Sequence, residues 1–315
     1  MQTTDTRDFE YDVLIIGGGP AGLSAALQLG RSLRSVLICD NGEPRNSSAA
    51  ESHGYLTRDG IPPEELHQLG REEVVRYGGE FRDTKVTDVS RDTNGFTSTL
   101  DSGETVTSRK VVLGTGVKDG LPDTDGFEEF WGKGVHHCPY CHGYEVRGDP
   151  LGVVVTDQHM IEYATLIYNL SDDLVVFTDG RDVFDEEARS MFIDRGIEIE
   201  DEPIVALTGS DGGLEHIVLA DGNEVTRHAL FYGPPIRQHS ALAERLGLEV
   251  NQEGLVETMQ SQDGIGFTSV EGLFVAGDAA SGSPASIPSA VADGHTVGAT
   301  VNMELSKEDF DGRWE

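Results

Sequence analysis

The chain has 315 residues, a length typical of two domains, and its 56 acidic and 23 basic side chains give a formal net charge of −33 at pH 7. So acidic a chain would repel a phosphate backbone, which argues against nucleic acid as its partner. No apolar run reaches the roughly 18 residues that a membrane span needs, and the first eight residues lack the features of a signal peptide, so we expect a soluble, cytoplasmic protein without a membrane segment.

The first predicted elements form a strand–helix–strand unit. The apolar run Tyr11–Ile16 indicates a buried strand, and the glycine-rich turn Gly17–Gly22 leads into a predicted helix over Leu23–Leu29. The next strand is predicted over Val36–Cys39 and ends at Asp40. This order of elements is the context in which G-x-G-x-x-G predicts a dinucleotide site.

Each residue of this motif has a physical task. Gly17 permits the tight turn, Gly19 lets the backbone approach a pyrophosphate, and Gly22 lets the helix pack closely on the strand. The helix N-terminus faces the phosphate charge. Asp40 would accept hydrogen bonds from a ribose.

The middle of the chain mixes a helix with short strands. A helix is predicted over residues 64–77, and alternating apolar residues predict strands over 81–89 and 95–100. The run 110–113 predicts another buried strand, which enters a second glycine turn, Gly114-Thr115-Gly116.

A second unit of the same type begins near residue 151. Strands are predicted over 151–155 and 174–177, with a helix over 160–169 between them. Further strands are expected near Ile197, Ile204, Ile217 and Leu230, and Pro234-Pro235 interrupts the chain as a linker does. The last motif is a strand that ends at Gly277-Asp278, followed by a helix from Ile287-Pro288.

The three cysteines fall into two classes. Cys39 ends an apolar run and is interpreted as a small core residue. Cys138 and Cys141 form a C-x-x-C pair, which in an intracellular chain indicates a redox dithiol or half of a zinc site. Because no second C-x-x-C supplies further ligands, we favour the redox dithiol and expect no metal; a zinc site and an inert pair are the alternatives.

The three motifs Gly17–Gly22, Gly114–Gly116 and Gly277-Asp278 together resemble those of the flavoprotein disulfide reductases with two dinucleotide-binding domains. The position of the C-x-x-C is similar to that in low-molecular-weight thioredoxin reductases, and the stretch Gly134–Glu145 resembles the branch that includes the gliotoxin and holomycin dithiol oxidases. The resemblance implies an α/β fold in which an FAD-binding Rossmann-like domain, residues 1–117 and 236–315, carries an inserted smaller Rossmann-like domain, residues 118–235. It also implies a homodimer.

The resemblance also implies a set of FAD-binding residues. These are Gly17, Gly19, Pro20, Ala21, Gly22, Asp40, Arg45, Asn46, Val86, Gly114, Thr115, Gly116, Gly277, Asp278 and Ile287. Among them Asp278 would bind the ribityl chain, and the backbone at Ile287 would face the flavin at a helix N-terminus. The segment 53–60 is expected to border the flavin cleft, and Trp314 or Phe310 is a candidate cover for a flavin face, with a frayed terminus as the alternative.

The chain departs from this family where NADPH should bind. No glycine occurs from residue 153 to 179, and Thr156, Asp157 and Gln158 stand where a second glycine motif is expected. The family's basic clamp for the 2′-phosphate is replaced by a segment, 178–182, with one arginine between acids. We therefore expect that NADPH and NADH do not bind, with a nicotinamide-dependent reductase that uses an atypical loop as the alternative.

Electrons would then pass between FAD, the dithiol and another partner. One route oxidises a small dithiol or a thioredoxin-like protein and passes electrons to O2; the other takes electrons from a ferredoxin-like protein. The sequence does not set the direction, and a flavin-carrying redox sensor without turnover is a third interpretation.

The resemblance implies that Cys138 reacts with the partner and Cys141 with the flavin. His142 stands where the family carries Asp, and an imidazole suits proton transfer at neutral pH. His137 and Glu145 are competing candidates for the acid or base.

The acidic charge itself is spread along the chain without a block of five, and only five of the basic residues are lysines. An acidic interaction tail would concentrate the charge. We interpret the composition as adaptation to a very salty cytoplasm, where molar salt shortens the screening length to about 3 Å.

Overall fold

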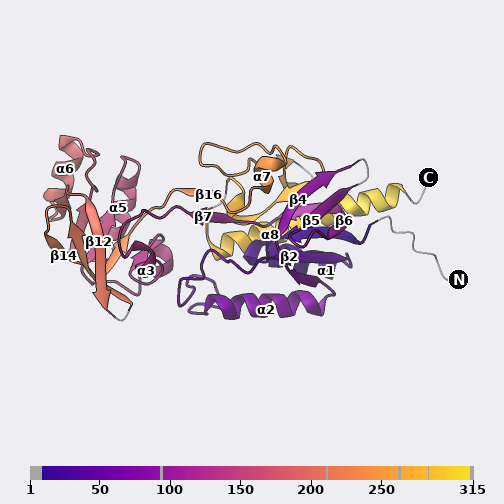
Figure 1. Ribbon diagram of the computed structural model, residues 1–315, viewed down its shortest axis with the longest axis horizontal. Coiled ribbons are helices and arrows are strands. Elements are labelled where there is room, and N and C mark those ends of the chain that lie inside the picture. The colour runs from indigo at the N-terminus through magenta and orange to yellow at the C-terminus, as the bar shows by residue number, and fades with distance from the viewer. Residues whose placement is uncertain (1–8, 93–94, 211, 262–263, 283, 313–315) are drawn as a thin grey trace. The chain divides into compact units, whose positions relative to one another are not determined.

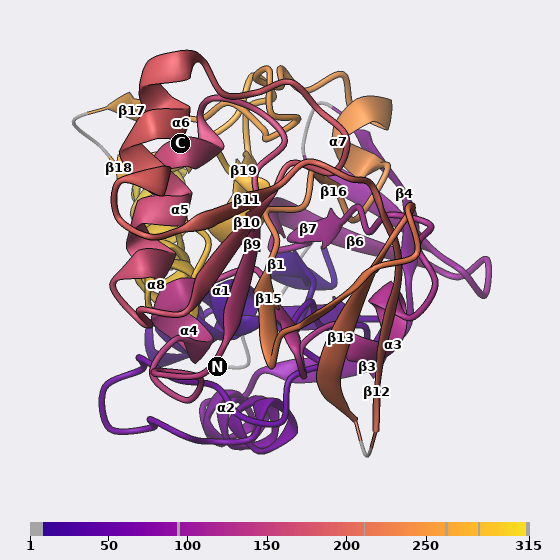
Figure 2. The ribbon, with the colours of Figure 1, turned by 90° about the vertical axis from the view of Figure 1, so that its left-hand side faces the viewer.

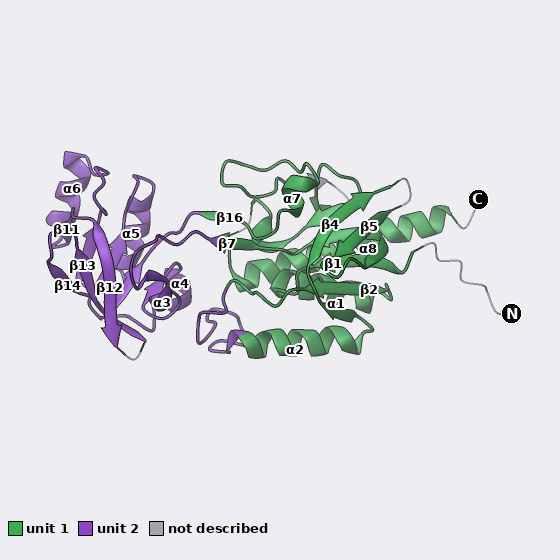
Figure 3. Cartoon of the chain, in the orientation of Figure 1, with its two compact units in different colours: residues 1–45, 64–118, 236–315 green, residues 46–63, 119–235 purple. Residues whose placement is uncertain are grey.

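The computed structural model describes residues 9–92, 95–210, 212–261, 264–282 and 284–312 (Figure 1). Trp314, the candidate flavin cover, lies outside these ranges. The chain forms two compact units, shown in green and purple in Figure 3: Met1–Arg45, Glu64–Lys118 and Ile236–Glu315 make unit 1, and Asn46–Pro63 and Asp119–Pro235 make unit 2. The predicted domain boundaries placed Asn46–Pro63 with the first domain, and the structure groups this segment with the second unit.

Unit 1 is built on a nine-stranded sheet whose main path runs β17-β18-β19-β6-β1-β2-β3, with β5 pairing β6 and β4 pairing β5. The strands are β1 Tyr11–Ile16, β2 Val36–Asp40, β3 Glu80–Asp83, β4 Val86–Arg91, β5 Phe96–Leu100, β6 Thr105–Leu113, β17 Met259–Ser261, β18 Gly264–Phe267 and β19 Leu273–Val275. The five strands from β3 to β19 pair in parallel. Because both faces of this parallel part are covered, β1 and β2 each contain four consecutive buried apolar residues, 13–16 and 36–39.

The helices of unit 1 are α1 Pro20–Arg31, α2 Pro63–Arg76, α7 Leu242–Arg245, α8 Ile287–Asp311 and the 3₁₀ turn η1 Gly277–Ala279. Helices α1 and α8 pack closely because α8 presents glycines to α1. A Cβ at Gly294 would lie 2.0 Å from the carbonyl oxygen of Ala21, and one at Gly298 would lie 2.9 Å from that of Ala25. Two further strands, β7 Val117–Asp119 and β16 Ile236–Gln238, form a two-stranded sheet where the chain passes between the units.

Unit 2 is built on a parallel five-stranded sheet in the order β11-β10-β9-β15-β8. Its strands are β8 Val135–His136, β9 Leu151–Val154, β10 Leu174–Phe177, β11 Glu198–Glu200 and β15 Ala229–Phe231, and a second, antiparallel sheet contains β12 Ile204–Ser210, β13 Gly213–Leu219 and β14 Glu224–Thr226. The helices are α3 Phe127–Phe130, α4 Pro139–His142, α5 Met160–Tyr168 and α6 Glu186–Ile193.

The parallel sheet of unit 2 is the middle of three layers (Figure 2). Successive residues of β9 point to opposite faces, so Val153 packs with α5 and α6 while Val154 packs with α3 and the antiparallel sheet. The predicted α/β fold with two Rossmann-like units is thereby confirmed. In the described part of the chain, no helix is both long and apolar enough to cross a membrane.

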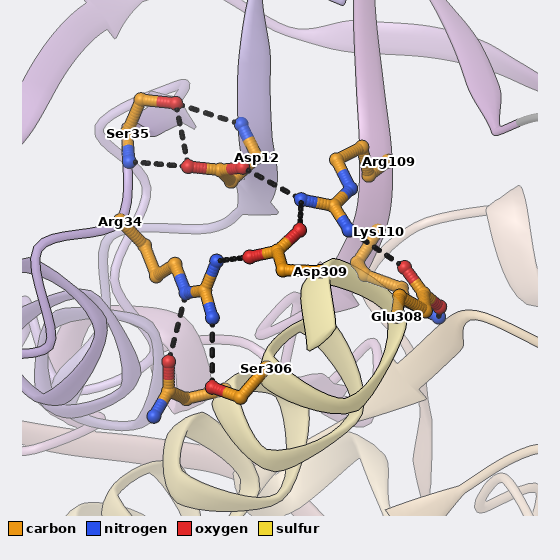
Figure 4. Close-up of polar contacts among 9 residues, drawn as sticks. Asp12, Arg34, Ser35, Arg109, Lys110, Ser306, Glu308 and Asp309 are labelled. Atoms are coloured by element: carbon orange, nitrogen blue, oxygen red, sulfur yellow. Dashed lines mark hydrogen bonds and ion pairs between the residues drawn. The ribbon is translucent and has the colours of Figure 1, made fainter. Parts of the chain in front are cut away.

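A network of ion pairs joins the C-terminal helix α8 to the sheet of unit 1 (Figure 4). Lys110 is only 8% exposed, and its Nζ lies 2.9 Å from Glu304 and 2.7 Å from Glu308. Burial disfavours the Lys110 charge, but the hydrogen bonds to these glutamates outweigh that cost and raise its pKa. Arg109 and Arg34 both pair with Asp309, at 2.8 and 2.5 Å.

Replacing Lys110 with Met should therefore lower the free energy of unfolding by about 1.5 kcal/mol, because the partly exposed Glu304 loses this cation and Glu308 keeps only Arg109. Urea unfolding at a fixed KCl concentration measures the loss. Lys307→Met is the matched control, since Lys307 lies on the exposed face of the same helix, and it should change stability by less than about 0.5 kcal/mol. Equal losses for the two variants would contradict the role of the buried pairs.

Candidate active site

Three backbone segments of unit 1 approach one another closely at the turn between β1 and α1. Gly17 has φ +105°, and a Cβ there would lie 2.3 Å from the carbonyl oxygen of Gly114. A Cβ at Gly22 would lie 1.9 Å from the carbonyl oxygen of Gly17. The glycines at 17, 22 and 114, predicted from separate motifs, therefore meet at one point.

The N-terminus of α1 is open where these segments meet. Gly19 is the N-cap, Pro20 and Ala21 begin the helix, and an added Cβ at Gly19 would have no atom within 4 Å. The carboxylate of Asp40, at the end of β2, lies beside the turn. A Cβ added at Gly18 would be only 2.7 Å from the Oδ2 atom of Asp40. This geometry can hold a phosphate at the helix N-terminus and a hydroxyl at Asp40.

His67 of α2 was not found from the sequence. Burial lowers its pKa, which the charge of Asp40 opposes, and its Nε2 has no hydrogen-bond partner among the described residues. The sequence gives no sign that His67 lies near Asp40, because a long connecting segment separates β2 from α2.

Arg45 and the 3₁₀ turn η1 form the other end of the predicted FAD-binding region. Arg45 Nη1 lies 2.9 Å from Asp278 Oδ2, and both side chains are about one-fifth exposed. Gly277 has φ +73°, and a Cβ there would lie 2.7 Å from the Cβ of Ala21. Helix α8 begins at Ile287, where Ser286 Oγ accepts a hydrogen bond from Ser289 N at 3.2 Å.

The remaining residues predicted for this site are placed differently. Val86 is buried in the core of unit 1, and Thr115 and Gly116 follow β6. Asn46 belongs to unit 2, where its Nδ2 lies 3.5 Å from Ser52 Oγ.

The dithiol centre lies in unit 2. Cys138 and Cys141 form a disulfide with a Cα–Cα distance of 5.2 Å, and Cys138 is the N-cap of the one-turn helix α4. Both cysteines are half-buried, whereas Tyr140 between them is 79% exposed. Partner thiols can therefore reach this turn from solvent in the described structure.

Two histidines stack beside the disulfide. The rings of His136, on β8, and His142 lie 4.6 Å apart between centroids and are nearly parallel, at 14°. Burial lowers the pKa of His136 to about 3, with a further contribution from His142. The pKa of His142 is also lowered, first by burial and then by His53, while Glu145 opposes the shift. Both nitrogens of His142 are buried without a hydrogen-bond partner in the described part of the chain.

His53 joins this cluster from the segment Asn46–Pro63. Its ring meets that of His142 edge-on, with centroids 6.4 Å apart, and its Nε2 lies 3.7 Å from Glu145 Oε1. From the sequence, the segment 53–60 that contains His53 is expected only to border the flavin cleft. Nothing in the spacing between residue 53 and residue 142 could have indicated their proximity.

The other two predicted acid–base candidates lie on either side of the disulfide. His137 stacks on Trp131 with centroids 5.8 Å apart, and its carbonyl oxygen accepts a hydrogen bond from Tyr163 at 3.1 Å. Glu145 is partly exposed and faces His53. No group of three or more metal-binding side chains occurs within the described ranges.

In the turn from β9 to α5, the side chain of Asp157 occupies the N-terminus of the helix. Asp157 Oδ1 accepts hydrogen bonds from the backbone N–H groups of His159, at 2.8 Å, and Met160, at 3.3 Å. A carboxylate thus covers the first N–H groups of the helix, where a phosphate would need to bind.

The adjacent end of β10 is also dominated by carboxylates. Asp201 accepts a hydrogen bond from Thr178 and pairs with Arg189 at 2.9 Å. The pKa of Glu200 is raised, first by burial and then by surrounding acids, the strongest of which is Glu198. This edge of unit 2 would repel an additional phosphate.

Comparisons with known proteins agree on one family. The family model described as pyridine nucleotide-disulphide oxidoreductase matches residues 11–294. The thioredoxin reductase sirT of Leptosphaeria maculans is 34% identical to this chain over 325 residues, covering 96% of this chain and 97% of that protein. A probable thioredoxin reductase of Arthroderma benhamiae is 30% identical and covers 96% and 82%, respectively.

Two solved structures are similar along almost their whole length. HlmI has a TM-score of 0.89 and 35% identity, covering 99% of this chain and 97% of that one. The putative thioredoxin reductase TrxB from Bacillus anthracis has a TM-score of 0.88 and 30% identity, covering 95% and 99%, respectively.

Proposed function

Because the chain belongs to the pyridine nucleotide-disulphide oxidoreductases and is a thioredoxin-reductase-like FAD-dependent disulfide oxidoreductase, we propose that Cys138 and Cys141 exchange two electrons with bound FAD and with a thiol or disulfide partner, without NADPH or NADH. One observation carries the proposed independence from NADPH and NADH: the carboxylate of Asp157 accepts hydrogen bonds from the N–H groups at the N-terminus of α5.

The residues of unit 1 fit FAD. The open N-terminus of α1 at Gly19 would take the pyrophosphate, and Asp40 would take the adenosine ribose. Asp278, held by Arg45, would bind the ribityl chain. FAD, when bound, supplies a two-electron carrier for the dithiol.

The residues of unit 2 do not favour a nicotinamide nucleotide. A pyrophosphate at α5 would have to displace the Asp157 carboxylate and then face its charge. A 2′-phosphate at the end of β10 would meet Asp201 and Glu200, and Arg189 is already paired with Asp201. These contacts support a second unit that presents the dithiol and does not bind NADPH.

The exchange at the dithiol is balanced in atoms and electrons. A partner thiolate attacks Cys138 Sγ, the Cys138–Cys141 bond breaks, and Cys141 leaves as a thiolate. The second partner thiol then attacks the mixed disulfide, so the partner is oxidised by two electrons and the protein disulfide is reduced. We assign to His142 the acceptance of the partner's thiol proton at a ring nitrogen, because burial keeps it neutral at pH 7. The exchange would then slow as the pH falls through the lowered pKa of His142.

Anaerobic mixing of the FAD-loaded protein with separate reductants tests the proposal. In molar KCl, dithiothreitol should bleach the flavin absorbance within seconds, whereas NADPH and NADH at equal concentration should not. Bleaching by NADPH at a catalytic rate would overturn the proposed independence from nicotinamide. Reduced ferredoxin, and hydrogen peroxide formation in air, then assign the direction; bleaching by dithiols without turnover would instead favour a redox sensor.

The proposal extends to the setting of the enzyme. The partner is a thioredoxin-like protein or a small dithiol, with O2 or ferredoxin as the second electron partner, and the enzyme is a cytoplasmic homodimer of a salt-adapted cell. The even spread of acids along the chain supports the salt adaptation.

A further inference from the structure

His53 lies on a closed loop of unit 2. The loop is joined at its base by Ser52 and Ile61, where Ser52 N donates to Ile61 O at 2.8 Å and Gly60 N donates to Ser52 O at 3.0 Å. Within the loop, Gly54 N donates to Asp59 Oδ1 at 2.8 Å. These bonds fix the backbone on both sides of His53, so its ring has a defined position.

Three carboxylates surround the His53 ring. Nε2 lies 3.5 Å from Glu51 and 3.7 Å from Glu145, and Nδ1 lies 3.6 Å from Asp59. Glu51 and Asp59 belong to the same loop, whereas Glu145 follows α4. The imidazolium form of His53 would therefore connect this loop to the segment that carries the disulfide.

His142 completes the arrangement. It meets His53 edge-on at 6.4 Å and stacks on His136 at 4.6 Å, so its buried ring faces two imidazoles and the carboxylate of Glu145. Both of its nitrogens are buried without a hydrogen-bond partner among the described residues, and in the neutral ring the unprotonated one can accept a thiol proton. A positive charge on His53 disfavours a second positive charge at this distance.

We propose that His53 is a positioning residue of the dithiol centre, which contacts Glu145 and the edge of the His142 ring and adds to the effect of burial in favouring the neutral form of His142 that accepts a thiol proton. The inference rests on the proposed exchange at Cys138 and Cys141. The proton passes from the partner thiol to a ring nitrogen of His142, and the resulting thiolate attacks the disulfide. His53 gains and loses no bond in this step.

Removing the His53 imidazole has an effect of predictable sign on His142. His53 lowers the pKa of His142 and Glu145 raises it, so without His53 the pKa of His142 should rise. His142 would then remain protonated to a higher pH. The acidic limb of the exchange rate should therefore move to higher pH.

The test uses the FAD-loaded protein with His53→Gln, His53→Arg and the control His216→Gln. His216 lies in the same unit, on β13, where its ring contacts Thr226 and not the dithiol centre. Two measurements are made from about pH 5 to 9: the rate of anaerobic flavin bleaching by dithiothreitol, and the NMR titration of the His142 ring in the oxidised protein. The NMR titration does not depend on turnover.

His53→Gln should raise both midpoints, and His53→Arg, which places a cation at this position, should not raise them. His216→Gln should change neither. Wild-type midpoints in His53→Gln, or an upward shift in His53→Arg equal to that in His53→Gln, would overturn the role of His53. Neither result depends on nicotinamide, so bleaching by NADPH would refute the proposed function and leave this inference standing.

Discussion

Replacing either Cys138 or Cys141 with serine is expected to reduce dithiol-driven bleaching of the flavin by at least about a thousandfold, with no loss of bound FAD. A hydroxyl cannot form the mixed disulfide or leave as a thiolate, so each variant removes one half of the exchange. Stopped-flow absorbance measures the rate, and the flavin-to-protein absorbance ratio measures FAD content.

The control for this experiment is Cys39→Ala. Cys39 is buried in the core of unit 1, and burial raises its pKa to about 11, so its thiol stays protonated and unreactive. The rate should stay within about twofold of wild type, because the variant removes one buried sulfur atom that takes no part in the exchange. A fall similar to that of the Cys138 and Cys141 variants would contradict the assignment of the dithiol.

The same variants also distinguish the two sulfurs. If Cys138 faces the partner, Cys141→Ser mixed with the disulfide form of the partner should accumulate a mixed disulfide, because the Cys138 thiolate attacks the partner disulfide, one partner sulfur leaves as a thiolate, and no second protein thiol resolves the adduct. Mass spectrometry of the unreduced protein detects the adduct. Its appearance only in Cys138→Ser would reverse the assignment.

Gly22→Ala is expected to lower the free energy of unfolding by about 3 kcal/mol and to give protein largely free of FAD. The new Cβ would lie 1.9 Å from the carbonyl oxygen of Gly17, a backbone atom that cannot rotate away. Helix α1 would have to move off β1, which disturbs the fold and the cofactor site together. Urea unfolding of the protein freed of FAD measures the first effect.

Gly19→Ala is the matched variant from the same turn. Gly19 has φ −70°, which alanine adopts readily, and no atom lies within 4 Å of the added Cβ. The FAD-free protein should keep its stability within about 0.5 kcal/mol, while FAD affinity falls about a hundredfold because the methyl group fills space meant for the pyrophosphate. Unchanged FAD affinity in Gly19→Ala would contradict the placement of FAD at this turn.

Much of the fold could be predicted because the parallel strands are buried on both faces. The runs at residues 13–16 and Leu174–Phe177 are apolar throughout, and both lie in strands of the structure. Helix α6, at Glu186–Ile193, was missed because it is short and largely polar, and α4 because its four residues leave no periodicity. The hairpin β17–β18 was also missed, because strands of three and four residues are too short to show a periodic pattern.

The candidate site divides in a similar way. Local motifs could be predicted, since Cys138 and Cys141 lie three residues apart and the glycines of the first turn lie within six. The absence of glycine before α5 predicted a poor phosphate site, but the bonds from His159 and Met160 to Asp157 became visible only in three dimensions. The cluster of His53 with His142 depends on packing between distant segments, which sequence spacing does not encode.

The grouping of Asn46–Pro63 with unit 2 has an evolutionary consequence. The chain passes between the two units four times, at 45/46, 63/64, 118/119 and 235/236, so unit 2 is not one contiguous insertion. Recombination that exchanged only residues 119–235 between relatives would import the cysteines and Glu145 but keep the host's loop around residue 53. Two stretches of gene separated by the 55 codons of residues 64–118 must therefore be inherited together for the dithiol centre to stay matched.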